Sequence, residues 1–178
     1  MSTDDSDRNP TEIELRAFVG PRAAHYWRRW RWYIENGKQG AGGLWPPLLF
    51  NLIWFLYRRM YREVWVPVAM FVSVGIIQGA VEGIIEVRRG VRFTTPKLLD
   101  TLINICLGLA TSWVGSYLYL RKFRNAVKIA RQTSPTPESA LEALRQAGGT
   151  SRLAAGIGIA VMVALFLLGL LLTDASAG

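Results

Sequence analysis

The sequence predicts an all-α integral membrane protein with three transmembrane helices, a short re-entrant or interfacial helix and an amphipathic N-terminal helix. Apolar residues make up 51% of the 178 residues. They gather in three runs of about 20 residues, the length that crosses the hydrocarbon core of a bilayer as a helix. Most charged residues lie between these runs, whereas a soluble domain would alternate polar and apolar residues along its elements.

The N-terminal region divides into a polar tail and an amphipathic helix. Residues 1–14 are acidic and polar, which predicts a disordered tail. Pro21 and Gly37 then fit the first position of a helix and the position just past its end. On a helical wheel, one face carries apolar and aromatic residues and the opposite face is basic. The first face comprises Ala23, Tyr26, Trp27, Trp30 and Ile34, and the second His25, Arg28, Arg29 and Trp32.

Two environments fit this helix and the second basic cluster that follows it. Helices of this kind lie in the headgroup plane, where Trp favours the interface and each Arg contributes about 1 kcal/mol toward anionic lipid. Alternatively, the helix packs on the rest of the protein, and the arginines act only as topology determinants. Nucleic acid is a poor fit, because no nucleic-acid module is visible. The predicted interface set is Trp27, Arg28, Arg29, Trp30, Arg31, Arg58, Arg59 and Arg62.

Residues 45–57 predict a short helix that does not span the bilayer. Thirteen residues rise about 20 Å, less than the ~30 Å hydrocarbon core. A crossing here would also place dense basic clusters on both sides of the membrane, against the positive-inside rule. We therefore assign residues 15–63 to a cytoplasmic region that holds the amphipathic helix and this re-entrant or interfacial helix. Residues 64–178 form the transmembrane region.

Three spans are predicted, at residues 64–85, 98–120 and 153–172. The second span continues out of the membrane as a basic helix within a cytoplasmic loop, residues 121–152. In that loop Thr136 fits the N-cap of a short amphipathic helix that begins with Pro137 and ends at Gly148.

Small and polar residues mark the faces of these spans that we expect to meet protein. Glycines spaced by four let another helix backbone approach closely, either within the chain, which we favour, or from another protein. Polar groups inside a span form an ion or proton site, or they hydrogen-bond between helices. The helix-packing set is Gly75, Gly79, Gly83, Gly108, Gly115 and Gly156, and the polar set is Gln78, Glu82, Asp100 and Asn104.

The distribution of Lys and Arg predicts the orientation. Three spans put residues 1–63 and 121–152 on one side, with seventeen basic residues, and residues 86–97 on the other, with four. The positive-inside rule then places the N-terminus in the cytoplasm and the C-terminus in the periplasm or outside the cell.

Several short motifs resemble those of a known family. The motifs are Phe18-Val19-Gly20, the aromatic-basic helix, the Gly-rich linker, and Phe50 followed, after three intervening residues, by Trp54-Phe55-Leu56-Tyr57-Arg58-Arg59-Met60-Tyr61. Weaker similarities lie at residues 117–121, 128–129 and 148–151. In these motifs the chain resembles the bacterial domain of unknown function 2628 family. The resemblance implies a small inner-membrane protein and carries over no activity or catalytic residue.

Three functions remain open on this sequence. The first is a non-enzymatic accessory or interaction subunit that packs on membrane lipids and on other membrane proteins or itself. The second is a small oligomeric transporter or channel subunit, with Gln78, Glu82 and Asn104 lining a polar path. A membrane enzyme using the carboxylates is the weakest, because no motif supports it. With one cysteine and one histidine in the chain, we expect no metal site and no cofactor.

Overall fold

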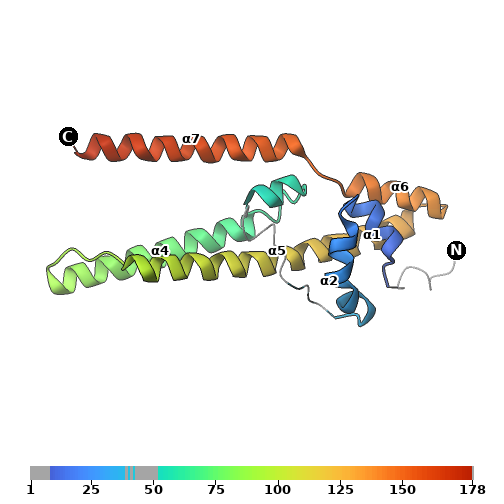
Figure 1. The fold of residues 1–178 in the computed structure, drawn as a ribbon, viewed down its shortest axis with the longest axis horizontal. Coiled ribbons are helices and arrows are strands. Elements are labelled where there is room, and N and C mark those ends of the chain that lie inside the picture. The colour runs from blue at the N-terminus through green and yellow to red at the C-terminus, as the bar shows by residue number, and fades with distance from the viewer. Residues whose placement is uncertain (1–8, 39, 41, 43–51, 178) are drawn as a thin grey trace.

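The chain folds into three long helices and a compact helical module at one end of them (Figure 1). This computed structural model describes residues 9–38, 40, 42 and 52–177, and these residues contain no β-strand. The segment predicted at 45–57 lies partly outside them; residues 52–57 are helical. The labelled helices are α1 Glu12–Val19, α2 Ala23–Glu35, α4 Trp65–Arg89, α5 Lys97–Thr133, α6 Pro137–Ala147 and α7 Arg152–Ala177.

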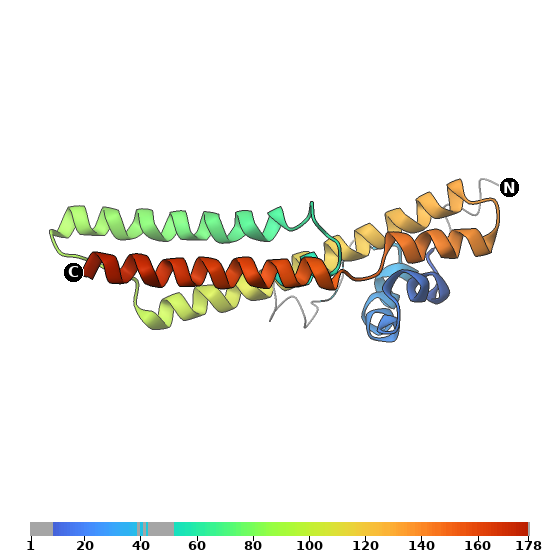
Figure 2. The same cartoon turned by 90° about the horizontal axis from the view of Figure 1, so that it is seen from above.

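Among the described residues, three helical stretches are long and apolar enough to cross a membrane: Trp65–Arg89, Lys97–Thr133 and Pro137–Ala164. The first two are α4 and α5, and the third includes the beginning of α7. Figures 1 and 2 show α4 and α5 running antiparallel, while α7 leaves the module separately and extends toward the same end of the molecule as the α4–α5 loop. By length and composition, this confirms the three predicted spans.

Helix α5 joins the membrane part to the module without a break. Its 37 residues rise about 55 Å, well beyond the ~30 Å of a hydrocarbon core. The predicted basic continuation of the second span is therefore helical. Its C-terminal half supplies core residues to the module: Tyr119, Leu120, Phe123, Val127 and Ala130.

Helix α1 is an element that the hydropathy pattern did not predict. Thr11 and Glu14 form a capping box: the Thr11 hydroxyl accepts from the Glu14 amide, and the Glu14 carboxylate accepts from the Thr11 amide at 2.7 Å. The helix buries Leu15, Phe18 and Val19. The tail predicted for residues 1–14 therefore gives way to helix at Glu12, and residues 1–8 lie outside the described part.

Helix α2 matches the predicted amphipathic helix but turns its apolar face inward. Ala23, Tyr26, Trp30 and Ile34 are buried in the module core. The Trp30 indole donates to the Ser116 hydroxyl on α5 at 3.2 Å, and Ser116 in turn donates to the Gly42 carbonyl oxygen at 2.7 Å. The helix begins at Ala23, so Pro21 belongs to the preceding turn.

Helix α6 closes the module from the C-terminal side. As predicted, Thr136 caps it and Pro137 is its first residue. It packs against α1 and α5 and buries Leu144. A side chain at Gly148 would overlap the Phe18 carbonyl group. Two backbone hydrogen bonds hold the residues that follow. The Gly149 amide donates to the Phe18 carbonyl oxygen at 3.0 Å, and the Ser151 amide donates to the Tyr57 carbonyl oxygen at 2.7 Å.

A buried ion pair ties α1 to the end of α5. The Arg131 guanidinium donates to both carboxylate oxygens of Glu14, at 2.7 and 2.8 Å, and the two side chains are 7% and 13% exposed. Burial raises the pKa of Glu14, but the hydrogen bonds from Arg131 and Thr11 outweigh it and hold the pKa below its ordinary value of 4.5. The native module therefore favours the ionised carboxylate.

We predict that Glu14→Gln destabilises the module by about 3 kcal/mol at pH 7, since removing one partner of a buried pair leaves a desolvated charge. Because the pKa of Glu14 is lowered, its contribution is full above pH 4.5 and is lost as the pH falls through the lowered value. Thermal unfolding in detergent at pH 7 and pH 3, followed by tryptophan fluorescence, should show the variant and the wild type converging in acid.

The matched control is Glu35→Gln, which removes the carboxylate of the exposed Arg31–Glu35 pair. An exposed pair contributes about 0.5 kcal/mol or less. Equal destabilisation by the two variants would contradict the assigned role of the Glu14–Arg131 pair.

Candidate functional site

The predicted interface residue Arg58 lies inside the module rather than at its surface. It is 3% exposed, and its guanidinium donates to the Tyr26 hydroxyl at 2.9 Å and to the Val19 carbonyl oxygen at 3.4 Å. The guanidinium carbon also lies 5.0 Å from the centre of the Tyr26 ring and 5.3 Å from that of Tyr119, within cation–π range. All these partners are neutral.

The Arg58 charge is thus only partly compensated within the module. Its Nε is buried with no hydrogen-bond partner in the described part of the chain, as is the Tyr119 hydroxyl. No carboxylate of the described residues forms an ion pair with Arg58. Burying a cation that faces only neutral groups costs free energy, and a bound anion would offset that cost. The surroundings of Arg58 are therefore the candidate site for a ligand.

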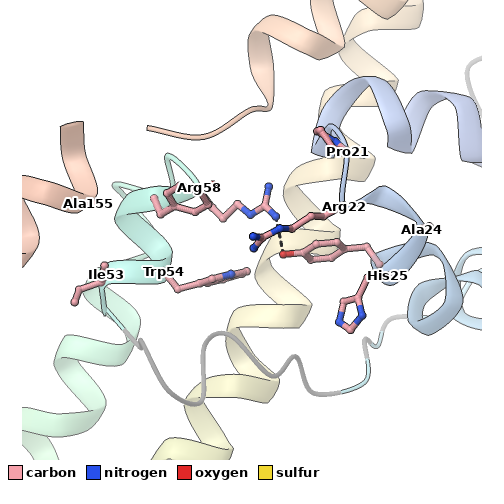
Figure 3. Close-up of a pocket in the computed structure, with 10 residues that line it drawn as sticks. Pro21, Arg22, Ala24, His25, Ile53, Trp54, Arg58 and Ala155 are labelled. Atoms are coloured by element: carbon pink, nitrogen blue, oxygen red, sulfur yellow. Dashed lines mark hydrogen bonds between the residues drawn. The ribbon is translucent and has the colours of Figure 1, made fainter. Parts of the chain in front are cut away.

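A cavity of about 670 Å³ lies beside Arg58 (Figure 3). Figure 3 shows Arg58 and Arg22 reaching toward each other from opposite walls, with Trp54 below them in that view. Arg22 comes from the turn before α2, and Ala155 from the first turns of α7. The lining residues are Pro21, Arg22, Ala24, His25, Tyr26, Ile53, Trp54, Tyr57, Arg58 and Ala155.

The electrostatics of this cavity are one-sided. Its lining holds two arginines and no carboxylate among the described residues. Burial, together with the charges of Arg29 and Arg28, lowers the pKa of His25 below its ordinary value of 6.5, so His25 is mostly neutral at pH 7. The remaining walls are aromatic or aliphatic. The arrangement suits an anion that carries apolar groups.

The other predicted interface residues divide by exposure. Trp30 is fully buried and Arg58 is nearly so, and neither faces lipid as predicted. Trp30 is part of the core because α2 packs onto α5, where its indole donates to Ser116. Trp27 is half-buried against the core. Those on the surface are Arg28, Arg29, Arg31, Arg59 and Arg62.

The predicted polar residues of the spans form two separate groups. The Asp100 carboxylate accepts from Gln78 at 3.4 Å and from Asn104 at 3.2 Å. Glu82 instead accepts from the amide and the hydroxyl of Thr95, both at 2.6 Å, in the loop between α4 and α5. Glu82 therefore fastens the loop to α4, and no hydrogen bond joins it to Asp100 or Asn104, the other acidic and amide members of the predicted polar set on α5.

The predicted helix-packing glycines also divide. A side chain placed at Gly75, Gly79, Gly83 or Gly156 would meet nothing within 4 Å in the described chain, so the expected packing of these glycines within the chain is not present. Gly115 packs closely: a Cβ there would lie 3.1 Å from the Phe55 ring. Gly108 is half-buried on α5.

Sequence reasoning missed several contacts that build the site. Gly158 on α7 is one, since a Cβ there would lie 2.6 Å from the Leu56 side chain. The Trp30–Ser116 bond and the Arg131–Glu14 pair are others, each joining residues far apart in the chain. Only the Thr11–Glu14 spacing offered a local signal. Among the described residues, no group of three His, Cys, Asp or Glu side chains could hold a metal ion.

We predict that Glu82→Ala loosens the α4–α5 loop, because the variant loses both hydrogen bonds from Thr95. Amide hydrogen exchange over residues 90–96, measured in detergent, should rise about tenfold, as expected when bonds to a charged group are lost. Glu86→Ala, one turn along α4, is the matched control and should leave the exchange unchanged. Unchanged exchange in Glu82→Ala would contradict the loop-fastening role.

Comparison with known proteins gives a family and nothing finer. A family model described as "Protein of unknown function (DUF2628)" matches residues 11–124. No curated protein and no solved structure was found to match. The matched region begins at the N-cap of α1, contains α2 and α4, and ends within α5, so it covers more than half of the chain. The chain therefore belongs to the DUF2628 family, as the sequence motifs indicated.

Proposed function

We propose that this protein is a non-enzymatic accessory or interaction subunit of the bacterial inner membrane, which packs on partner membrane proteins and on anionic lipid. The observation that carries the proposal is the uncovered small-residue face of α4. Gly75, Gly79 and Gly83 follow one another at a spacing of four and have no neighbour in the described chain. In a bilayer such a face lets a second helix approach closely, which favours helix association.

The limited packing among the spanning helices supports the same proposal. None of the apolar stretch of α4 is buried inside the protein. Over the described residues α7 does not pack along α4 or α5. The helical module, by contrast, has a closed aromatic core. A chain whose packed core lies in the helical module, and whose spanning helices make few contacts with one another, is suited to bind helices of a partner.

The polar group on the α4–α5 hairpin favours a protein neighbour over lipid at that position. Asp100 and Asn104 are exposed, and exposed polar groups are costly in hydrocarbon. The same exposure is the specific observation behind the second candidate, a transporter or channel subunit, in which several copies would bring Gln78 and Asn104 around a polar path. Glu82, engaged with Thr95, is the least suited of the predicted path residues.

We also propose that the module lies in the cytoplasm and that the α4–α5 loop and the C-terminus lie on the other side. Residues 1–63 and 121–152 carry seventeen basic residues, and residues 86–97, which include the loop between α4 and α5, carry four. Figure 1 supports a common side for the module elements, because α1, α2 and α6 cluster at one end of the three long helices.

This orientation predicts opposite labelling of two introduced cysteines. In a Cys106→Ser background, Arg92→Cys in the α4–α5 loop should react with a membrane-impermeant maleimide in cells whose outer membrane has been made permeable. Arg145→Cys on α6 should react only after lysis. Both positions are exposed, so burial does not bias the comparison. Labelling of Arg145→Cys before lysis would contradict the proposed orientation.

The packing role of α4 predicts that Gly79→Leu removes a partner. Native purification in mild detergent, with mass spectrometry of the copurifying proteins, should show a stoichiometric partner with the wild type and its loss, by about tenfold or more, with the variant. Ala80→Leu, the adjacent exposed position, is the matched control. A heteromeric partner supports the accessory function, and a homo-oligomer supports the transporter alternative. Retention of every partner by Gly79→Leu would contradict the role of the ridge.

A further inference from the structure

We propose that the cavity between Arg22 and Arg58 binds the headgroup of an anionic phospholipid. The inference deepens the proposed association with anionic lipid and rests on it. The general proposal needs only the exposed arginines of the module surface. This one assigns a defined site, made by the turn before α2, by residues 53–58 and by the start of α7.

The charge distribution selects an anion. Arg58 carries a full positive charge at 3% exposure, bonded only to neutral acceptors and to aromatic faces. Across the cavity, the side chain of Arg22 forms no hydrogen bond or ion pair with another described residue, and only its carbonyl oxygen is bonded, to the His25 amide. An anion between the two guanidinium groups would offset the repulsion between them, and it would accept charge-assisted hydrogen bonds from Arg22, which is exposed and free to turn toward it.

The rest of the lining selects a lipid over a small ion. Ile53, Trp54 and Ala155 give the cavity an apolar wall on the side from which Arg58 extends. A volume of about 670 Å³ exceeds what an inorganic phosphate fills and lies within the range typical of organic ligands. The wall therefore has room for the glycerol part of a lipid and the first methylenes of its chains.

The position of the cavity also favours a phospholipid. Ala155 belongs to α7, three positions after its first residue, and Trp54 belongs to the helical segment that precedes α4. The cavity therefore lies where two apolar helices leave the module. Headgroups of the adjacent leaflet lie at that depth, and Trp is favoured there. A phospholipid could reach the arginines with its chains still in the hydrocarbon.

The test uses the full chain, purified in neutral detergent and stripped of lipid. Binding of dioctanoyl phosphatidylglycerol is measured by native mass spectrometry and by tryptophan fluorescence. Arg22→Gln should weaken binding about tenfold, the loss expected when one hydrogen bond to a charged group is removed. The matched control, Arg28→Gln, removes one charge from α2 outside the cavity and should weaken binding by about threefold or less, because exposed charges are screened.

A second variant keeps the test independent of Arg58, which is part of the core. Ala24→Glu places a carboxylate on the exposed wall of the cavity and should weaken binding at least as much as Arg22→Gln. Each variant must retain the wild-type unfolding temperature in the absence of lipid. Loss of binding by Ala24→Glu at an unchanged unfolding temperature supports the site, and unchanged binding by this variant contradicts it.

Two further ligands separate the possible sources of the anion. Dioctanoyl phosphatidylcholine should bind at least tenfold more weakly, and inorganic phosphate or glycerol 3-phosphate should fail to compete at concentrations near the dissociation constant of the lipid. Competition by free phosphate at that concentration, or equal losses in Arg22→Gln and Arg28→Gln, would overturn the site.

The two levels of proposal fail differently. If wild-type protein binds phosphatidylglycerol and the cavity variants bind it equally well, the site is wrong and surface association stands. If the wild type shows no preference for phosphatidylglycerol over phosphatidylcholine, the association with anionic lipid is itself wrong. The partner experiment on Gly79 is unaffected by either result.

Discussion

The length of α5 is the constraint on which the rest of the structure depends. A single helix of 37 residues rises about 55 Å and cannot fit within a hydrocarbon core of about 30 Å. Its surplus turns must be solvated or covered, and the aromatic face around Tyr119 and Phe123 requires cover. Helices α1, α2 and α6 provide it, so the module is assembled on a helix that is long and apolar enough to cross a membrane.

The sequence was sufficient for features that depend on local patterns. The spans follow from runs of apolar residues, and α6 from the Thr136 cap and Pro137, because each signal lies within its own element. The inner face of α2 was also readable, since the 3.6-residue period groups Tyr26 with Trp30. Helix α1 was missed although its capping box at Thr11 and Glu14 is a local signal, because its eight residues EIELRAFV hold no long apolar run.

The sequence was insufficient where one composition fits two environments. Trp and Arg together suit both a headgroup interface and an aromatic core that holds one cation. Only the contact between α2 and α5 decides between these two environments, and its hydrogen bond joins Trp30 to Ser116, which are 86 residues apart in the chain. The cavity was out of reach for the same reason, since Arg22, Arg58 and Ala155 come from three distant segments. The glycines of α4 mark a packing surface, yet their spacing does not say whose helix covers it.

The backbone bonds that fasten the turn before α7 have a consequence for biosynthesis. The carbonyl groups of Phe18 and Tyr57 are synthesised early, and they accept from the amides of Gly149 and Ser151, which are synthesised 131 and 94 residues later. Helix α1 likewise packs on α6, which leaves the ribosome only after two spans have been synthesised. The first helices must therefore remain without their partners while α4 and α5 are synthesised, and the module closes as the last step, once α6 and the turn before α7 are complete.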